Sequence, residues 1–288
     1  VKDDSLAAGK GVAVTLDRAD ARSHAESVFA NAGGKNVRVL IEEYLDGPEV
    51  SLFYLSDGTN VRALLPATDF KRLLDGDAGP NTGGMGAYCP LPWAPTDLVD
   101  IVTRDVAQPT IDEMRRRGTP FIGLLYAGLA LTSNGVRVIE FNARFGDPET
   151  QVVMAMLATP LYDMLFAAAT GSLAELAPIT WREGSAVCIV LAAQGYPQAP
   201  RSGDVIHLGD DSTTSWILHA GTAVDDGQLI TAGGRVLSAV SVGVDAAQAR
   251  SRAYDRAQQV SFEGMHMRGD IALAAATDAM TTYGRLSP

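Results

Sequence analysis

Three polar side chains follow one another along a predicted strand near the middle of the 288-residue chain. Glu140 and Asn142 project from the same face of this strand, because side chains alternate between faces along a strand. A carboxylate and an amide oxygen at this spacing form a pair of hard oxygen ligands, which suits Mg²⁺ when phosphate and water supply its other ligands. Arg144 lies on the same face and adds a planar cation suited to a carboxylate or phosphate. Taken alone, Glu-x-Asn is more often the solvated face of an edge strand.

A glycine-containing loop near the N-terminus offers a second candidate site, for an anion. In Gly9-Lys10-Gly11, the small residues let backbone N–H groups approach an oxyanion, and the lysine can reach out from the tip. The spacing is not that of a P-loop, and a strand rather than a helix follows. Lys2, at the end of the preceding strand, is a second candidate cation for a phosphate. A plain hairpin turn is the competing interpretation.

A predicted strand that runs out into a linker forms a third candidate site. Its last residues are Glu42, Glu43, Tyr44 and Leu45, whose backbone can offer N–H and C=O groups to a flat base. The carboxylate of Glu49, a few residues on, can accept hydrogen bonds from ribose hydroxyls. An acidic surface hairpin is the competing interpretation of this segment.

Two adjacent cations followed by a glycine-rich loop form a fourth candidate site. Lys71 and Arg72 place positive charge in an otherwise acidic protein. The loop that follows contains Asn81, Thr82 and Gly83, and its glycines allow a ligand to approach the backbone closely. We interpret it as a shaped binding loop, with a flexible surface loop as the alternative.

Composition limits the classes of function. The formal net charge of −11 argues against nucleic acid as a main partner, because phosphate backbones require a basic footprint. The two cysteines, Cys89 and Cys188, do not form a disulfide framework, and the four histidines lack metal-ligand spacing. No apolar run reaches membrane-spanning length, so we expect no membrane association and a cytoplasmic setting.

The hydrophobic pattern predicts an α+β protein with a change of character near residue 183. We expect an Asn134-Gly135 type I′ turn in a central hairpin, and Pro109 either to kink a helix or to start a new one. The predicted helices are 17–32, 96–117, 148–157, 161–170 and 245–260. The predicted strands are 12–16, 37–41, 49–55, 61–65, 121–131, 136–142, 186–193, 204–207, 215–220, 229–232 and 236–244.

Together, these segments resemble the ATP-grasp ligases, and among them the glycinamide ribonucleotide synthetase family of purine biosynthesis. The resemblance spans the whole chain and is carried by the segments 1–12, 42–45, 79–88 and 140–151. It implies two α+β lobes around a nucleotide cleft within residues 1–183, with a small lobe at about 1–65, and a small mixed β/α C-terminal domain at 184–288. The chain starts at Val1 without a methionine, and we interpret it as a fragment lacking the family's N-terminal domain.

The resemblance also implies a role for each candidate residue. The ATP phosphates would be held by Lys2, Gly9, Lys10 and Gly11, and the nucleoside by Glu42, Glu43, Tyr44, Leu45 and Glu49. Mg²⁺ or Mn²⁺ would be held by Glu140 and Asn142. The catalytic groups would be Arg144, Lys71 and Asp147, and the other residues on the acceptor side would be Arg72, Asn81, Thr82, Gly83, Gly146 and Pro148.

The implied reaction joins glycine to 5-phosphoribosylamine through glycyl phosphate, with release of ADP and phosphate, by a monomer or weak dimer. Phosphoryl transfer requires mainly alignment and charge neutralisation, which agrees with a candidate set of cations, metal ligands and glycines. One alternative is another ATP-grasp carboxylate–amine ligase with a different acceptor. A second is a nucleotide-binding fragment that is inactive without its missing N-terminal domain.

Overall fold

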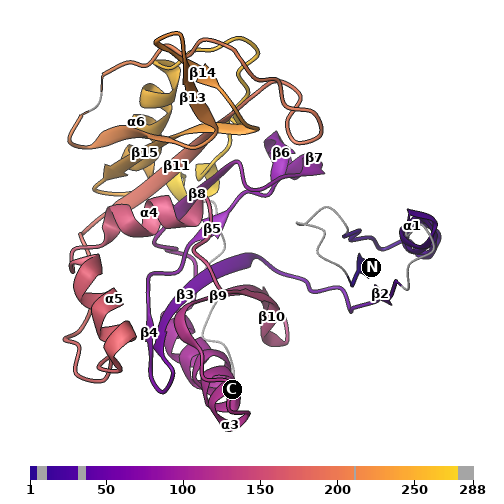
Figure 1. Cartoon of the computed structure of the whole chain (residues 1–288), viewed down its shortest axis with the longest axis vertical. Coiled ribbons are helices and arrows are strands. Elements are labelled where there is room, and N and C mark those ends of the chain that lie inside the picture. Colours follow the sequence, from indigo (N-terminus) through magenta and orange to yellow (C-terminus); the bar gives the residue numbers. More distant parts are fainter. Residues whose placement is uncertain (5–11, 32–36, 211, 278–288) are drawn as a thin grey trace. The chain divides into compact units, whose positions relative to one another are not determined.

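The structure, a computed structural model, describes residues 1–4, 12–31, 37–210 and 212–277 (Figure 1). The chain divides into two compact units, Val1–Gly47 and Pro48–Pro288. We describe each unit by itself. No helix in the described part of the chain is both long and apolar enough to cross a membrane.

The first unit contains one helix and a short two-stranded sheet. Strand β1 (Lys2–Asp3) pairs antiparallel with β2 (Val39–Leu40), and α1 spans Arg18–Asn31. The strand expected at 12–16 is reduced to a single bridge between Val12 and Lys2. The prediction failed because its apolar side chains find nothing to pack against: Leu16, for example, is 88% exposed.

A four-stranded antiparallel sheet opens the second unit. Its order is β10-β9-β3-β4, with β3 at Glu49–Asp57, β4 at Val61–Ala63, β9 at Ile122–Thr132 and β10 at Gly135–Asn142. We had expected β3 and β4 in a small lobe extending to about residue 65. Instead, β3 pairs with β9 along its whole length, from Glu49 opposite Ala130 to Asp57 opposite Ile122, which ties both strands to this larger sheet.

Helices cover both faces of this sheet. Val50 and Leu52 belong to one buried cluster with residues of α2 (Leu98–Val102) and α3 (Gln108–Arg116), whereas Phe53 and Leu55 belong to a second cluster with α5 (Leu161–Thr170). The alternation follows from the two-residue period of a strand. The helix predicted at 96–117 is interrupted by a π-helical turn at Thr103–Ala107, and Pro109 sits in the first turn of α3, where its missing N–H is tolerated.

A second, five-stranded sheet joins segments that are far apart in the sequence. Its order is β12-β15-β11-β8-β5, and all of its pairs are antiparallel. The two strands β5 (Thr68–Asp69) and β8 (Gly86–Cys89) precede residue 183. The other three strands follow residue 183: β11 (Ser185–Ala192), β12 (Ser215–His219) and β15 (Arg235–Gly243).

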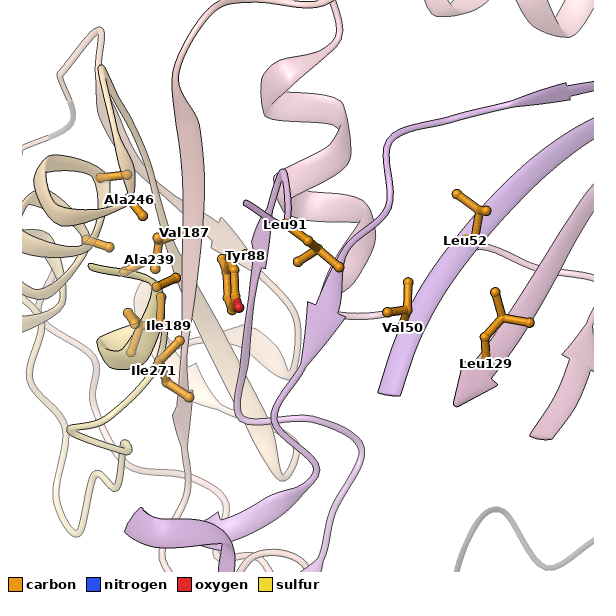
Figure 2. Packing of buried hydrophobic residues seen from close by; sticks show 14 of the residues in the cluster. Val50, Leu52, Tyr88, Leu91, Leu129, Val187, Ile189, Ala239, Ala246 and Ile271 are labelled. Atoms are coloured by element: carbon orange, nitrogen blue, oxygen red, sulfur yellow. The ribbon is translucent and has the colours of Figure 1, made fainter. Parts of the chain in front are cut away.

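The central strand β11 is apolar on both faces because helices cover both. Val187 and Ile189 pack in the cluster that includes α6 (Ala246–Gln258), and Ala186 and Cys188 in the cluster that includes α4 (Glu149–Met156). Figure 2 shows Val187, Ile189, Ala239 and Ala246 gathered around the first of these faces, with Tyr88 alongside. This explains the uninterrupted apolar run in the sequence.

Two hairpin turns illustrate the limits of turn prediction. The β9–β10 hairpin forms, but its turn residues are Ser133 and Asn134, and Gly135 lies opposite Thr132. The predicted type I′ turn is wrong, because it requires positive φ at both central residues and only the glycine of the Asn-Gly pair has one, at +91°. Asp226 and Gly227 do both have positive φ, between β13 (Thr222–Asp225) and β14 (Gln228–Thr231).

The remaining short elements connect the glycine-rich loop and the C-terminus to these layers. They are β6 (Arg72–Leu74), a 3₁₀ turn at Asp75–Asp77, β7 (Ala78–Asn81) and α7 (Leu273–Ala276). Strands β6 and β7 pair with each other, with Arg72 opposite Asn81. The segment that carries the predicted acceptor-side cations is therefore a hairpin of its own.

Candidate functional site

Glu140 and Asn142 lie on one face of β10, as the sequence predicts. Asn142 Nδ2 donates a hydrogen bond to Glu140 Oε1 at 2.9 Å, across a strand with an irregular register between Val138 and Glu140. Gly128 stands opposite Glu140 on β9, where an added Cβ would come within 3.4 Å of Glu140 Cγ. In the described ranges, no group of three or more His, Cys, Asp or Glu side chains could hold a metal ion. The pair therefore fits a cation that takes most of its ligands from elsewhere.

Lys71 sits between two carboxylates. Its Nζ is 2.6 Å from Asp69 Oδ1 and 2.7 Å from Glu49 Oε2. Burial lowers the pKa of Lys71, but the Asp69 and Glu49 carboxylates outweigh it and the net pKa is raised. Lys71 is therefore a fixed cation at neutral pH, and it holds in place the carboxylate that the sequence predicts for ribose.

A buried carboxylate lies beside this cluster. Glu149, at the start of α4, is 4% exposed, and its Oε1 accepts a hydrogen bond from Ser51 Oγ at 2.8 Å. The Ser51 hydroxyl is also 2.9 Å from the Tyr126 hydroxyl. Burial raises the pKa of Glu149, and the nearby Asp69 raises it further, while the Ser51 hydrogen bond and Lys71 lower it.

The raised pKa of Glu149 predicts a pH-dependent effect on stability. A carboxyl whose folded-state pKa lies above its ordinary value of 4.5 favours folding most at low pH, and this contribution is lost as pH rises through the folded pKa. Glu149→Gln keeps an oxygen for Ser51 and removes the charge. We expect the melting temperature of this variant to rise relative to the wild type between about pH 5 and about pH 8. The exposed Glu175→Gln is the control, and parallel curves for all three proteins would contradict the prediction.

Arg235 joins the glycine-rich loop to the turn before α4. Its Nη1 donates to the carbonyl oxygens of Gly83 and Asp147, both at 2.6 Å, and its Nη2 is 3.3 Å from Asp147 Oδ2. An added Cβ on Gly83 would lie 2.9 Å from Arg235 Cζ, and one on Gly84 would lie 2.5 Å from Pro148 Cδ. The loop at 83–84 and the turn at 147–148 are thus in direct contact, so residues from two of the predicted segments meet.

This contact predicts that the two glycines Gly84 and Gly76 respond differently to substitution. Both have positive φ, +111° and +67°, but nothing lies within 4 Å of a Cβ added to Gly76. Gly76→Ala should therefore lower the free energy of unfolding by about 1 kcal/mol, the strain of a left-handed alanine. Gly84→Ala adds the clash with Pro148 and should lower it by about 3 kcal/mol. Chemical denaturation checks this, and equal losses would contradict it.

A cavity of about 670 Å³ lies beside the same turn. It is lined by Gly146 and Asp147, by residues of α4 including Thr150 and Gln151, and on the far side by β12. Gln151 Nε2 donates to Asp147 Oδ1 at 2.9 Å, which fixes the orientation of its amide. Two of the predicted acceptor-side residues therefore border a space that can hold a small molecule.

The other predicted residues of the second unit have mainly structural contacts. Arg72 Nη1 donates to Gly79 O at 2.7 Å, and Thr82 Oγ1 donates to Lys71 O at 2.9 Å. Arg144 is exposed and bonds the adjacent Phe145 carbonyl, at 3.0 Å. Asn81 is exposed at the end of β7.

In the first unit, the structure brings two of the predicted nucleotide residues together. Lys2 Nζ is 2.8 Å from Glu42 Oε2, and Glu43 and Tyr44 are exposed, whereas Leu45 is half-buried. The predicted phosphate loop, Gly9, Lys10 and Gly11, lies outside the described residues.

Sequence reasoning missed several polar groups at this site. Glu149 lay within a segment that we singled out, but its burial beneath Gly146 comes from tertiary packing: an added Gly146 Cβ would lie 2.8 Å from Glu149 Oε2. Ser51 and Tyr126 belong to strands whose pattern reads only as core. Arg235 follows Gly233-Gly234, which we took for a turn, and a lone arginine entering an apolar strand was the available signal.

Comparison with solved structures defines the class of fold. A biotin carboxylase domain from Hydrogenobacter thermophilus, solved with MgADP, superposes with a TM-score of 0.61 over 86% of this chain and 53% of that one, at 15% identity. Such a match shows the fold alone. The chain has the α+β architecture of the ATP-grasp proteins, as the sequence predicts.

The family follows from closer matches. The model of the phosphoribosylglycinamide synthetase ATP-grasp (A) domain matches residues 1–150, and that of the phosphoribosylglycinamide synthetase C domain matches residues 186–274. The chain belongs to the phosphoribosylglycinamide synthetase family. A crystal structure of phosphoribosylamine–glycine ligase from Thermotoga maritima has a TM-score of 0.83 at 36% identity, covering 94% of this chain and 68% of that one.

Relatives in sequence agree with this assignment. Phosphoribosylamine–glycine ligase of Streptomyces coelicolor is 58% identical over 281 residues, which is 96% of this chain and 66% of the relative. The Synechocystis protein of the same name is 45% identical and covers 94% of this chain and 65% of that protein. The chain thus spans just under two thirds of the length of these relatives.

Proposed function

We propose that this chain is the ATP-grasp and C-terminal part of an ATP-dependent ligase that joins glycine to 5-phosphoribosylamine in purine biosynthesis. The observation that carries the proposal is the match of both family models, supported by the contact between the glycine-rich loop and the turn at 147–148. We assign residues 1–183 to the ATP-grasp part and 184–288 to the C-terminal part. We expect a cytoplasmic protein, monomeric or weakly dimeric, acting on small molecules.

The reaction has two steps. A carboxylate oxygen of glycine attacks the γ-phosphorus of ATP, the bond to the β,γ-bridging oxygen breaks, and ADP leaves. The amine of 5-phosphoribosylamine then attacks the carbonyl carbon of glycyl phosphate, loses a proton, and expels phosphate, which gives the amide. Both steps develop charge on phosphoryl oxygens, so fixed cations and backbone N–H groups are the useful protein groups.

The residues divide between the nucleotide and the acceptor. We assign Glu49 to the ribose, because its carboxylate is held by Lys71 at a fixed place on β3. Exposed Arg144 is assigned to the developing acyl phosphate, and Lys71, whose raised pKa keeps it charged, to the same negative charge. The remaining assignments for nucleotide binding are Lys2, Gly9, Lys10, Gly11, Glu42, Glu43, Tyr44 and Leu45, and those for the acceptor side are Arg72, Asn81, Thr82, Gly83, Gly146, Asp147 and Pro148.

A divalent cation, Mg²⁺ or Mn²⁺, is assigned to Glu140 and Asn142. The oxygens of the carboxylate and the amide on one exposed strand face are hard donors that fit such an ion. When bound, the cation would neutralise charge on the phosphates of the nucleotide.

An acceptor panel tests the proposal. The protein that contains this chain is mixed with ATP, glycine and one amine at a time, and ADP release is followed. We expect release to require both glycine and 5-phosphoribosylamine, generated from ribose 5-phosphate and ammonia. Release with another amine or another carboxylic acid would instead identify a different ATP-grasp ligase. ATP binding without any release would identify a nucleotide-binding protein without catalysis.

A further inference from the structure

The cavity between α4 and β12 contains polar atoms that the protein leaves unpaired. Thr150 Oγ1 and Gln151 Oε1 both line it, both are buried from solvent, and neither has a hydrogen-bond partner among the described residues. A buried polar atom without a partner destabilises a protein by about 1–3 kcal/mol. Two such atoms in one cavity indicate that something else hydrogen-bonds to them there.

The orientation of Gln151 defines what that partner must be. Its Nε2 donates to Asp147 Oδ1, so the atom left for the cavity is Oε1, which only accepts. Asp147 is itself engaged on both oxygens, by Gln151 and by Arg235. A ligand in this cavity must therefore bring hydrogen-bond donors, and the Thr150 hydroxyl can donate or accept in turn.

The other walls narrow the chemistry further. Trp216 and Leu218 from β12 and Met154 from α4 make an apolar side, and Arg182 adds a cation. An aromatic face, acceptors for hydroxyl groups and an arginine together suit a phosphorylated sugar, whose ring packs on the indole and whose phosphate pairs with the guanidinium. The volume of about 670 Å³ is ample for a pentose phosphate.

We propose that this cavity binds the phosphoribosyl part of the amine acceptor, with ribose hydroxyls on Thr150 and Gln151 and the phosphate on Arg182. Naming the sugar as ribose 5-phosphate rests on the proposed function. The cavity residues Thr150, Gln151, Arg182 and Trp216 then determine which amine the enzyme accepts.

Direct binding tests this without turnover. Ribose 5-phosphate, ribose and inorganic phosphate are titrated separately into the protein by isothermal titration calorimetry. We expect ribose 5-phosphate to bind more tightly than either fragment, and Gln151→Leu to weaken it by about 10-fold or more, the loss of one buried hydrogen bond. Gln228→Leu, an exposed glutamine on β14, is the matched control and should bind as the wild type does.

Several outcomes would overturn the inference. These are no measurable binding of ribose 5-phosphate, equal affinity for inorganic phosphate alone, or an unchanged affinity in a folded Gln151→Leu protein. The glycine-dependent assay separates this inference from the proposed function. An unchanged KM for the acceptor in Gln151→Leu would remove the cavity and leave the ligase intact. Absence of glycine-dependent ADP release in the wild type would remove the ligase, while sugar phosphate binding that depends on Gln151 would still stand.

Discussion

Glu140→Gln is expected to lower glycine-dependent ADP release by at least about 100-fold. Glutamine has the size of glutamate and keeps an oxygen that can accept the 2.9 Å hydrogen bond from Asn142 Nδ2, so the strand should keep its shape. What is lost is the negative charge that a divalent cation requires of its one carboxylate ligand in this pair. The measurement is the turnover number at saturating ATP and Mg²⁺.

The control for this prediction is Glu183→Gln, an exposed glutamate after α5, which should leave turnover unchanged. Raising the Mg²⁺ concentration should partly restore the Glu140→Gln rate if the defect is weak cation binding. A Glu140→Gln protein with full turnover would remove this residue from the metal site and, with it, the pair on β10.

Arg268→Ala is expected to give the largest loss of stability, about 3 kcal/mol. The Arg268 side chain is 1% exposed, and its Nε and Nη2 each donate to Asp270, both at 2.7 Å. Its Nη1 donates to Asp77 at 2.8 Å and to the Arg72 carbonyl at 3.1 Å, and its Cζ lies 5.0 Å from the centre of the Phe70 ring. Removing it leaves Asp270, 22% exposed, without its strongest partner.

This prediction reaches the site because Arg268 holds the strand that carries Arg72. We expect Arg268→Ala to lower the midpoint of chemical denaturation and to raise the KM of the acceptor. Arg115→Ala is the contrasting variant, since its bridge to Asp112 lies on the surface, and it should change stability by less than about 0.5 kcal/mol. Equal losses in the two variants would contradict the role given to Arg268.

The parts of the fold that the sequence predicted are those with a strong local pattern. The α4, α5 and α6 helices, the β9–β10 hairpin and the apolar strand β11 follow from periodicity and glycine stops, and the structure confirms them. The segment at 12–16 has the same alternation but no partner surface, so it stays largely unpaired. Local pattern specifies an element only when tertiary packing is there to bury it.

The candidate site divides along the same line. The pairing of Glu140 with Asn142 could be read from their spacing on one strand. The contacts of Arg235 with Gly83 and of Glu149 with Ser51 could not, because they join residues 152 and 98 positions apart. A sheet that combines β8 with β11 and β15 creates those meetings, and a single sequence does not specify that pairing.

The most direct test of the account follows the oxygen atoms of glycine. The protein that contains this chain is supplied with ATP, 5-phosphoribosylamine and glycine labelled with ¹⁸O in both carboxylate oxygens, and the released phosphate is analysed by mass spectrometry. Attack of the carboxylate on the γ-phosphorus predicts one ¹⁸O atom in each phosphate, with the other retained in the amide. Unlabelled phosphate would mean that ATP is cleaved by water, and that no glycyl phosphate is formed.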